Sequence, residues 1–239
     1  MTSRTLTGRT QPEADHIRQL FDRIAPQYDQ LNQDLSFGLH RVWKQMAVRW
    51  SGAAEGMCCL DVCCGSGDLA LLLARRVGAS GHVTGVDFAT RQLAIAAQRS
   101  PHLQPRLTWR EADALDLPFA DGSFDAATMA YGLRNLTDIF KGLSELRRVL
   151  KPGAKAAILD FAVPTNPLVR QFQQGYLNHI VVPTAERCGL SEEYAYISPS
   201  VDRFPPGAEQ VALAEASGFA RAVHYPIAGG MMGVLVATR

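Results

Sequence analysis

The chain has 239 residues, a formal net charge of +1 at pH 7 and a hydrophobic content of 47%. This length suits one large α/β domain with an added cap, and the dispersed charge does not suggest a nucleic-acid surface. No stretch reaches the roughly 18 apolar residues of a membrane span, and the polar start is not typical of a signal peptide. We therefore expect a cytoplasmic enzyme with at most a loose, peripheral membrane contact.

Residues 1–52 are expected to form a polar tail followed by two amphipathic helices. Apolar side chains recur at helical spacing over Ala14–Tyr28 and over Gly38–Trp50. Two such helices ahead of the first strand favour a lid over a cofactor. The alternative, that they only cover an edge of the sheet, stays open. Residues 53–239 are expected to form the main domain.

The stretch Met57–Ala70 is interpreted as a strand, a tight turn and the start of a helix. Met57–Val62 has the composition of a buried parallel strand, and Leu69–Val77 is rich in helix-forming residues. Between them, Gly65 and Gly67 allow a sharp turn that brings backbone N–H groups close to a ligand. The pattern G-x-G-x-x-A alone also fits a dinucleotide site.

Asp61 favours a different ligand at this turn. A carboxylate repels a pyrophosphate, whereas it attracts the ammonium of an amino acid. S-Adenosylmethionine carries an ammonium and a sulfonium but no phosphate, so we interpret the turn as a methyl-donor site. A nicotinamide-dependent oxidoreductase stays open as an alternative, although the chain lacks a Tyr-x-x-x-Lys pair. A non-catalytic partner in an assembly of biosynthetic proteins is the third class.

Strands and helices then alternate, which predicts a doubly wound, mostly parallel α/β sheet of seven strands. The last two strands are so close in sequence that they must form a hairpin, which puts an antiparallel edge on the sheet. The later predicted strands are His82–Val86, Arg106–Arg110, Phe124–Met129, Ala156–Phe161, Ala220–Pro226 and Met232–Thr238, and the helices are Thr90–Arg99, Asp138–Leu150 and Gly207–Ser217.

The segment 163–206 interrupts this alternation. It places Phe172, Tyr176, His179, Tyr194 and Tyr196 among prolines and small polar residues. Because long segments after a strand often carry function, we expect an insertion of helices that builds a substrate pocket.

Candidate ligand-binding residues follow the ends of strands, where open α/β sheets bind ligands. Asp87 can bridge the two hydroxyls of a ribose, or else cap the next helix, and Phe88 follows it. The Asp113 carboxylate can accept a hydrogen bond from an adenine amino group, while the N–H of Ala114 contacts a ring nitrogen. Ala130 opens the segment after the fourth strand and is assigned to the same site.

The cysteines do not form a metal motif. Cys58 and Cys59 are adjacent on a strand, so their side chains point to opposite faces. No C-x-x-C pair has a distant partner pair. We therefore expect these thiols to be small buried packing groups and expect no metal.

Five segments carry distinctive motifs: F-D-R-I-A-P-Q-Y-D-Q-L-N (Phe21–Asn32), S-F-G-L-H-R-V-W-K (Ser36–Lys44), L-D-V-C-C-G-S-G-D (Leu60–Asp68), Y-G-L-R-N (Tyr131–Asn135) and R-V-L-K-P-G (Arg148–Gly153). Together they resemble the quinone C-methyltransferases of ubiquinone, menaquinone and phylloquinone synthesis, within the class I S-adenosylmethionine-dependent methyltransferases. The resemblance covers nearly the whole chain. The ending G-G-M-M-G-V-L-V-A-T-R and the V-C-C-G-S-G turn are similar to the phylloquinone branch.

This resemblance implies donor contacts from Ser66 beside the methionine part, Asp87 at the ribose, and Asp113 with Ala114 at the adenine. These roles agree with those argued above from residue chemistry.

The resemblance also places Tyr28, Asp113 and Arg134 near the reacting centre. The permanent charge of Arg134 suits a developing phenolate oxygen, and the alternative is a salt bridge from a surface loop. The general base stays open among His40, Asp113 acting through a water, and His179.

The implied activity is C-methylation of a prenylated 1,4-naphthoquinol, with phytyl as the expected tail. Demethylmenaquinol or a ubiquinone precursor is the alternative substrate. The ring must be reduced, because a quinone is too electron-poor to attack a methyl group. The lid helices and the insertion would enclose the tail in an apolar slot. Since this substrate lives in a membrane, we expect transient attachment to the membrane surface. A homodimer is one candidate oligomeric state.

Overall fold

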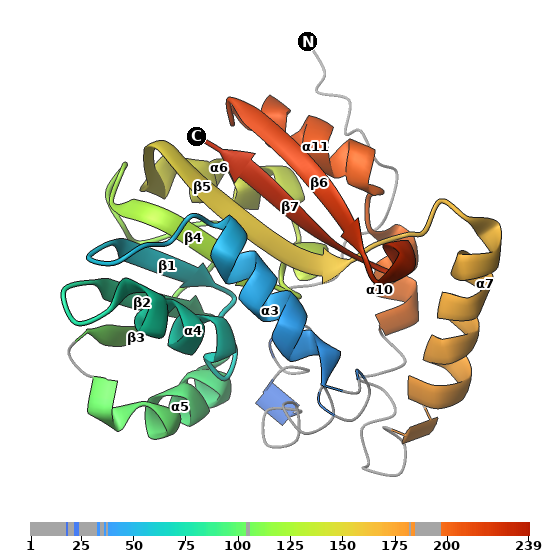
Figure 1. Ribbon diagram of the computed structural model, residues 1–239, viewed down its shortest axis with the longest axis horizontal. Helices are drawn as coiled ribbons and strands as arrows, with labels where there is room; N and C mark the ends of the chain where they lie inside the picture. The colour runs from blue at the N-terminus through green and yellow to red at the C-terminus, as the bar shows by residue number, and fades with distance from the viewer. Residues whose placement is uncertain are drawn as a thin grey trace.

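The computed structural model describes residues 18, 22–23, 33, 36, 38–103, 106–181, 183–184 and 197–239. Within them, seven strands form one sheet in the order β3-β2-β1-β4-β5-β7-β6 (Figure 1). Strands β1 to β5 pair in parallel, and β7 runs antiparallel to β5 and β6. This confirms the predicted fold. The strands are β1 (Cys58–Val62), β2 (His82–Asp87), β3 (Leu107–Glu111), β4 (Phe124–Ala130), β5 (Leu150–Phe161), β6 (Arg221–Ile227) and β7 (Met232–Thr238).

The final hairpin forms the edge of the sheet as predicted, with β6 outermost and β7 next to β5. This order follows from composition. Strand β7 reads MGVLVAT and is mostly buried, whereas β6 reads RAVHYPI and is mostly accessible. The more apolar strand therefore takes the interior position, where neighbours cover both of its edges.

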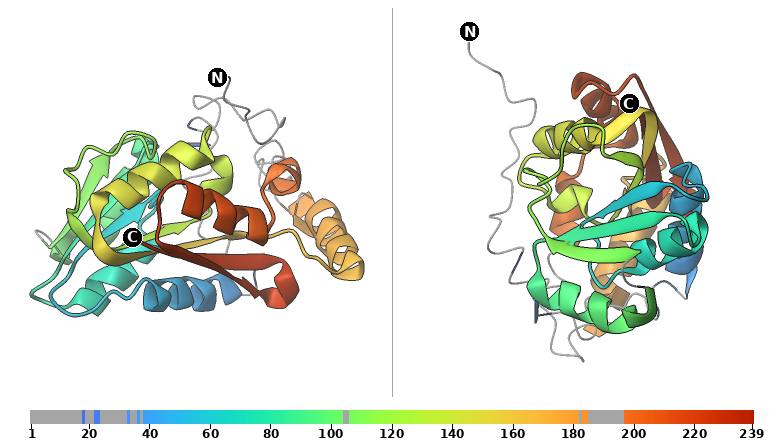
Figure 2. Two further views of the ribbon diagram at one scale, coloured as in Figure 1. Left: turned by 90° about the horizontal axis from the view of Figure 1, so that it is seen from above. Right: turned by 90° about the vertical axis from the view of Figure 1, so that its left-hand side faces the viewer.

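Helices cover both faces of the sheet (Figure 2). Helices α3 (Leu39–Trp50) and α4 (Asp68–Val77) lie on one face, and α6 (Ile139–Val149) and α11 (Gly207–Ala216) lie on the other. Helix α5 (Thr90–Arg99) packs against β2 and β3. The other described helical elements are η1 (Pro101–Leu103), η2 (Leu133–Asn135), α7 (Pro167–Tyr176), η3 (Leu177–Val181), α10 (Ile197–Arg203) and η4 (Ala228–Gly230).

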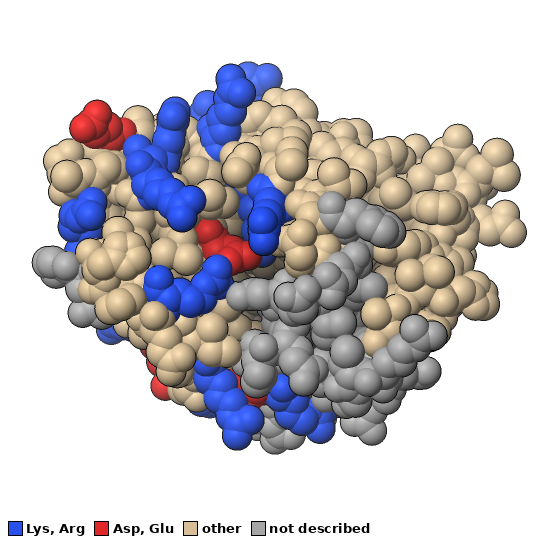
Figure 3. Space-filling view, turned by 60° about the horizontal axis from the view of Figure 1, so that its bottom comes forward, with Lys and Arg blue, Asp and Glu red and all other residues tan. Residues whose placement is uncertain are grey.

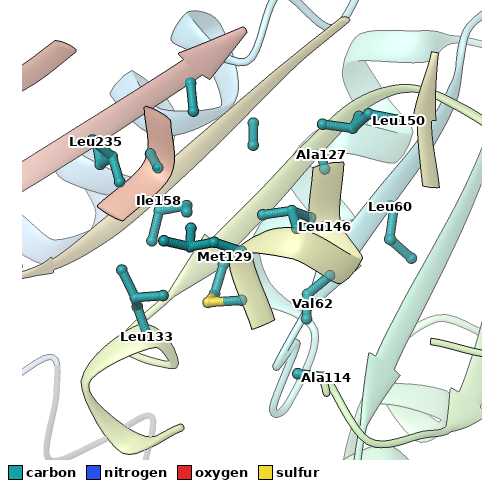
Figure 4. Packing of buried hydrophobic residues seen from close by; sticks show 14 of the residues in the cluster. Leu60, Val62, Ala114, Ala127, Met129, Leu133, Leu146, Leu150, Ile158 and Leu235 are labelled. Carbon is teal, nitrogen blue, oxygen red and sulfur yellow. The ribbon is translucent and has the colours of Figure 1, made fainter. Parts of the chain in front are cut away.

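Each face of the sheet buries an apolar core. Figure 4 shows one of them, in which Leu146 of α6 joins Met129 and Ile158 from neighbouring strands. The other core includes Ala47 and Val48 of α3, which are buried with residues of α4 and β1. Helix α3 therefore belongs to a packed layer of the domain, although it lies within the segment 1–52 that was expected to hold lid helices.

The observed helices and strands follow the predicted ones closely, with one clear difference. The predicted helix Asp138–Leu150 and strand Ala156–Phe161 left residues 151–155 between them, but β5 already begins at Leu150, directly after α6. The pairing of β4 with β5 shifts register between Phe124 and Ala126, and this irregularity accommodates the extra residues. The N–H of Gly153 donates to the Arg239 carbonyl at 2.8 Å, which holds this part of β5 against the end of the chain.

Two predicted regions are covered only in part. Of the predicted helix Ala14–Tyr28, the structure describes positions 18, 22 and 23 alone, so that prediction lies largely outside the described residues. The segment 163–206 contains α7, η3 and α10, which agrees with an insertion of helices. Tyr194 and Tyr196 fall outside the described part of that segment.

The indole of Trp109 on β3 packs directly against two glycines. A Cβ added to Gly67 or Gly85 would lie 2.4 Å from a Trp109 ring carbon. The indole Nε1–H donates to Ser100 Oγ at 3.1 Å, which fixes the ring. Gly67 also has a φ of +91°, a conformation that side chains disfavour. Glycine at position 67 is therefore required for both backbone and packing reasons.

We predict that Gly67→Ala lowers the free energy of unfolding by about 2–4 kcal/mol, because strain from positive φ adds to overpacking against Trp109. Gly153→Ala is the matched control, since Gly153 also has a positive φ of +80° but nothing within 4 Å of an added Cβ. The control should lose only about 1–2 kcal/mol. Urea unfolding measures both, and equal losses would show that the Trp109 contact is unimportant.

Candidate functional site

A cavity lies at the carboxyl ends of β1, β2 and β4, beside the glycine turn. This is the edge at which open α/β sheets bind ligands. Helix α3 contributes Lys44 to its wall, and the segment after β4 contributes Tyr131 and Asn135. Seven of the residues predicted to bind the cofactor line this cavity: Gly65, Ser66, Asp87, Phe88, Asp113, Ala114 and Ala130.

The turn after β1 is held by its own hydrogen bonds. The N–H of Cys64 donates to the Val86 carbonyl, and the N–H of Gly67 donates to the Cys64 carbonyl, both at 2.9 Å. The N–H of Gly65 donates to Asp87 Oδ2 at 2.8 Å. The sequence suggested that backbone N–H groups of this turn would contact the ligand. At Gly65 and Gly67, however, they stabilise the protein itself.

Asp87 holds the turn and the chain just ahead of α5, and its place on the cavity wall leaves the predicted ribose role possible. Its second oxygen, Oδ1, accepts the N–H of Ala89 at 2.9 Å, just before α5 begins. The backbone groups of Gly65, Phe88 and Ala89 donate to this carboxylate, which has about four acceptor sites and so can accept a further hydroxyl donor. Burial raises the pKa of Asp87 to about 6, although its backbone hydrogen bonds oppose the rise. The side chain can therefore brace the turn and accept hydrogen bonds from a ribose.

Asp113 and Ala114 lie together after β3, at the other end of the cavity wall. Asp113 Oδ1 accepts the N–H of Leu115 at 2.8 Å, which orients the carboxylate. Both residues line the cavity, and their contact with an adenine stays a prediction.

A partly buried ion-pair network, which the sequence reasoning missed, adjoins the turn. Lys44 Nζ donates to Asp68 Oδ2 at 2.7 Å, and Arg99 Nη2 donates to Asp68 Oδ1 at 2.7 Å. Arg99 Nη1 also contacts Ser66, at 2.8 Å to its carbonyl oxygen and 3.0 Å to Oγ. Burial raises the pKa of Asp68, but the two cations outweigh burial and lower it to about 2. The network joins α3, α4 and α5 around the turn.

Charges of both signs are visible on the face that Figure 3 shows. Acidic side chains lie in a hollow near the centre of this face, and Lys and Arg side chains gather around it. This mixed distribution agrees with the balanced charge of the sequence.

Asp61 is not placed as its predicted role requires. Its side chain is 0% exposed and does not line the cavity. Oδ1 accepts the Thr128 hydroxyl at 2.8 Å, and among the described residues Oδ2 has no hydrogen-bond partner. The reason is strand alternation, because Leu60 and Val62 face the α6 side and Asp61 therefore faces α3 and α4. Direct contact with a ligand ammonium is not supported.

Arg134 forms a salt bridge, as the alternative interpretation held, but with a buried partner, Asp160. It is buried rather than on a surface loop, and it does not line the cavity. Its Nη1 lies 2.6 Å from Asp160 Oδ1 and also donates to the Tyr131 carbonyl at 2.9 Å. The guanidinium lies between the rings of Tyr131 and Phe161, at 5.9 and 5.1 Å from their centroids. Its charge is therefore matched inside the protein.

The remaining predicted residues lie away from the cavity or outside the described chain. His40 is buried on α3 and its Nδ1 lies 2.8 Å from Ser36 Oγ, so it is not on the cavity wall. Gly67 packs against Trp109 rather than lining the cavity. His179 is exposed on η3. Tyr28 lies outside the described residues.

We predict that Asp61→Asn flattens the dependence of stability on pH. Burial raises the pKa of Asp61 to about 7 in the folded protein, against about 3.9 in an unfolded chain. Ionisation therefore opposes folding, and stability is lost as the pH rises from about 4 to 7. Between these pH values the free energy of unfolding should fall by roughly 1–4 kcal/mol less in the variant than in the parent, because each pKa unit corresponds to about 1.4 kcal/mol.

Urea unfolding at about pH 4.5 and pH 8 measures this difference, and comparison with the parent at the same pH cancels the contribution of other carboxylates such as Asp68. The amide oxygen that the substitution introduces can still accept the Thr128 hydroxyl, so the hydrogen bond is kept while the charge is removed. Identical pH dependence of the two proteins would contradict the prediction.

We also predict that Arg134 and Asp160 are strongly coupled in stability. Arg134→Met or Asp160→Asn alone should lower the free energy of unfolding by about 3–5 kcal/mol, because each leaves a buried charge without its partner. The double variant should lose clearly less than the sum of the two. A double-mutant cycle by urea unfolding tests this, and additive losses would refute the coupling.

Comparisons with known proteins agree with this geometry. Residues 9–239 match the model of the ubiE/COQ5 methyltransferase family. A 2-phytyl-1,4-naphtoquinone methyltransferase from Trichormus variabilis is 63% identical, over 94% of this chain and 99% of that protein. The chloroplastic 2-phytyl-1,4-beta-naphthoquinone methyltransferase of Arabidopsis thaliana is 51% identical, over 93% of this chain and 87% of that protein.

A solved structure shares the fold at much lower identity. A SAM-dependent methyltransferase from Aquifex aeolicus matches with a TM-score of 0.60 and 22% identity, covering 82% of this chain and 88% of that one. The shared topology, the cavity at the strand ends and the nearly full-length sequence match lead to one conclusion. The chain belongs to the ubiE/COQ5 methyltransferase family.

Proposed function

We propose that this chain transfers a methyl group from S-adenosylmethionine to a ring carbon of 2-phytyl-1,4-naphthoquinol, the reduced form of the quinone. The observation that carries the proposal is the 63% identity, over nearly the full length of both chains, to a protein named for this quinone. The arrangement of the cavity supports the donor half of the reaction independently.

The residues of the cavity fit S-adenosylmethionine better than a dinucleotide. Asp68, Asp87 and Asp113 line the described part of the cavity against one cation, Lys44, so the excess of negative charge would repel a pyrophosphate. Asp87 would accept the ribose hydroxyls, and Asp113 with Ala114 would bind the adenine. When bound, the donor supplies an electrophilic methyl group on a sulfonium. This charge pattern replaces Asp61 as the reason to prefer a donor without phosphate.

Asn135 is suited to orient the acceptor ring. It lines the cavity, and its Nδ2 donates to the Tyr131 carbonyl at 2.8 Å. Among the described residues its Oδ1 is buried without a hydrogen-bond partner. A buried amide oxygen without a partner is costly, so a hydroxyl donor from the acceptor would stabilise it. Arg134 would act indirectly, because its guanidinium donates to the Tyr131 carbonyl that also accepts from Asn135.

The acceptor must lose a hydroxyl proton before its ring carbon becomes nucleophilic. Among the candidate bases, Asp113 lines the cavity and His40 does not. Because Asp113 is also assigned to the adenine, away from the methionine part, it would take the proton through a water. Tyr28 stays a proposed contributor on the strength of the family resemblance.

The proposal includes a peripheral membrane contact, because a substrate with a phytyl tail lies in a membrane. Leu168 and Phe172 on α7 are 75% and 62% exposed, and Ile180 on η3 is 48% exposed. Such side chains can enter the interfacial region of a bilayer. No helix in the described part of the chain is long and apolar enough to cross a membrane.

The activity is tested with purified protein, S-adenosylmethionine and 2-phytyl-1,4-naphthoquinone held in its reduced form. Mass spectrometry should detect a product heavier by one methylene unit, with the new methyl group on carbon, and the oxidised substrate should give none. Parallel reactions with menaquinone and ubiquinone precursors decide the preferred ring. Absence of product with every reduced quinone would refute the proposal.

We predict that Asp87→Ala weakens the binding of S-adenosylhomocysteine by about 1–3 kcal/mol, the cost of losing a charged acceptor. The same substitution removes the acceptor of the Gly65 N–H, so a lower melting temperature should accompany the loss. Glu215→Ala, an exposed acid on α11, is the control. Calorimetric titration measures both, and unchanged affinity in the Asp87 variant would exclude the ribose role.

A further inference from the structure

Lys44 is a cation on the wall of a cavity whose other charged lining residues are acids. It is the one Lys, Arg or His among the described residues that line the cavity, beside Asp68, Asp87 and Asp113. Its side chain is only 7% exposed. Burying an ammonium is costly unless strong partners compensate for the lost hydration. Asp68 supplies one such partner, but the position of Lys44 on the cavity wall requires a further explanation.

The order of the strands shows which part of the donor would reach Lys44. Adenine is assigned to Asp113 after β3, and the ribose to Asp87 after β2. Strand order continues from β2 to β1 and then β4, so the methionine part would lie over the ends of β1 and β4. Lys44 lies at this place, with its Nζ 2.7 Å from Asp68 and 5.8 Å from the centroid of the Tyr131 ring.

The methionine part carries a carboxylate, which needs hydrogen-bond donors. The turn does not provide them at Gly65 or Gly67, because Asp87 and the Cys64 carbonyl already accept those N–H groups. An ammonium has three N–H donors, and one of them is directed at Asp68. We infer that Lys44 binds the α-carboxylate of S-adenosylmethionine through its remaining donors. This inference rests on the proposed methyl donor.

The network around Asp68 would make Lys44 ready for this role. Asp68 remains a carboxylate at working pH, and it is held from its other side by Arg99 at 2.7 Å. The Lys44 side chain is therefore pre-positioned, so little rotamer entropy is lost when the ligand binds. Because Lys44 comes from α3, carboxylate binding would also couple this helix to occupancy of the cavity.

Decarboxylated S-adenosylmethionine isolates the proposed contact, since it keeps the ammonium, sulfonium, ribose and adenine and lacks only the carboxylate. Calorimetry should show that Lys44→Met weakens binding of S-adenosylmethionine about tenfold or more, the usual value of a hydrogen bond between charged groups. Binding of the decarboxylated ligand should stay within about twofold of the parent protein, because no contact to it is removed. Lys44→Arg, which keeps the charge, should restore part of the affinity.

Arg49→Met is the matched control, as it removes a positive charge from the exposed face of the same helix. It should leave both affinities unchanged. If the Lys44→Met variant does not fold, Lys44→Gln replaces it, because an amide can still donate to Asp68.

Equal losses for the two ligands would show that Lys44 only supports the structure, and unchanged affinity for both would exclude any contact. Either result would contradict the inference about Lys44 without contradicting S-adenosylmethionine as the proposed methyl donor. If the parent protein binds neither ligand, the proposed donor is wrong and the role of Lys44 is wrong with it.

Discussion

The hydrogen bonds accepted by the buried Asp87 carboxylate hold together the parts of the chain on which the cavity depends. One oxygen takes the N–H of Gly65 in the turn after β1, and the other takes the N–H of Ala89 before α5. Two neighbouring strand ends and the start of a helix thus share one acceptor. Because this acceptor is at the cavity wall, the group that braces the turn is also available to a ligand. The structure of the turn and the proposed contact with the ribose would therefore depend on the same side chain.

The carboxyl groups near the turn differ in pKa because their surroundings differ. Asp61 and Asp87 are buried mainly against neutral groups, and burial raises both pKa values. Asp68 is paired with Lys44 and Arg99, which lower its pKa. Burying ionised Asp61 and Asp87 lowers the stability of the fold at neutral pH, whereas the paired Asp68 raises it. A positively charged donor in the cavity would offset this cost for Asp87, which lies on the cavity wall, whereas Asp61 does not line the cavity.

The Y-G-L-R-N segment shows how a motif residue can support a site without lining the cavity. Arg134 and Asn135 both donate to the Tyr131 carbonyl, and Tyr131 and Asn135 line the cavity while Arg134 does not. The buried pair of Arg134 with Asp160 ties this segment to the end of β5. An arginine held in this way transmits its effect through the backbone it positions, so its loss would alter the shape of the cavity as well as the charge near it.

Sequence alone determined the order of the elements, most of their boundaries, the glycine turn and the acids at strand ends. These follow from local periodicity and from the rule that parallel strands present their carboxyl ends at one edge. Tertiary structure alone decided which side chains face the cavity. Asp61 is turned away by strand alternation, Arg134 is paired with a residue 26 positions later, and Lys44 reaches the cavity from a helix that precedes the sheet. Such contacts join segments distant in sequence, and no local pattern specifies them.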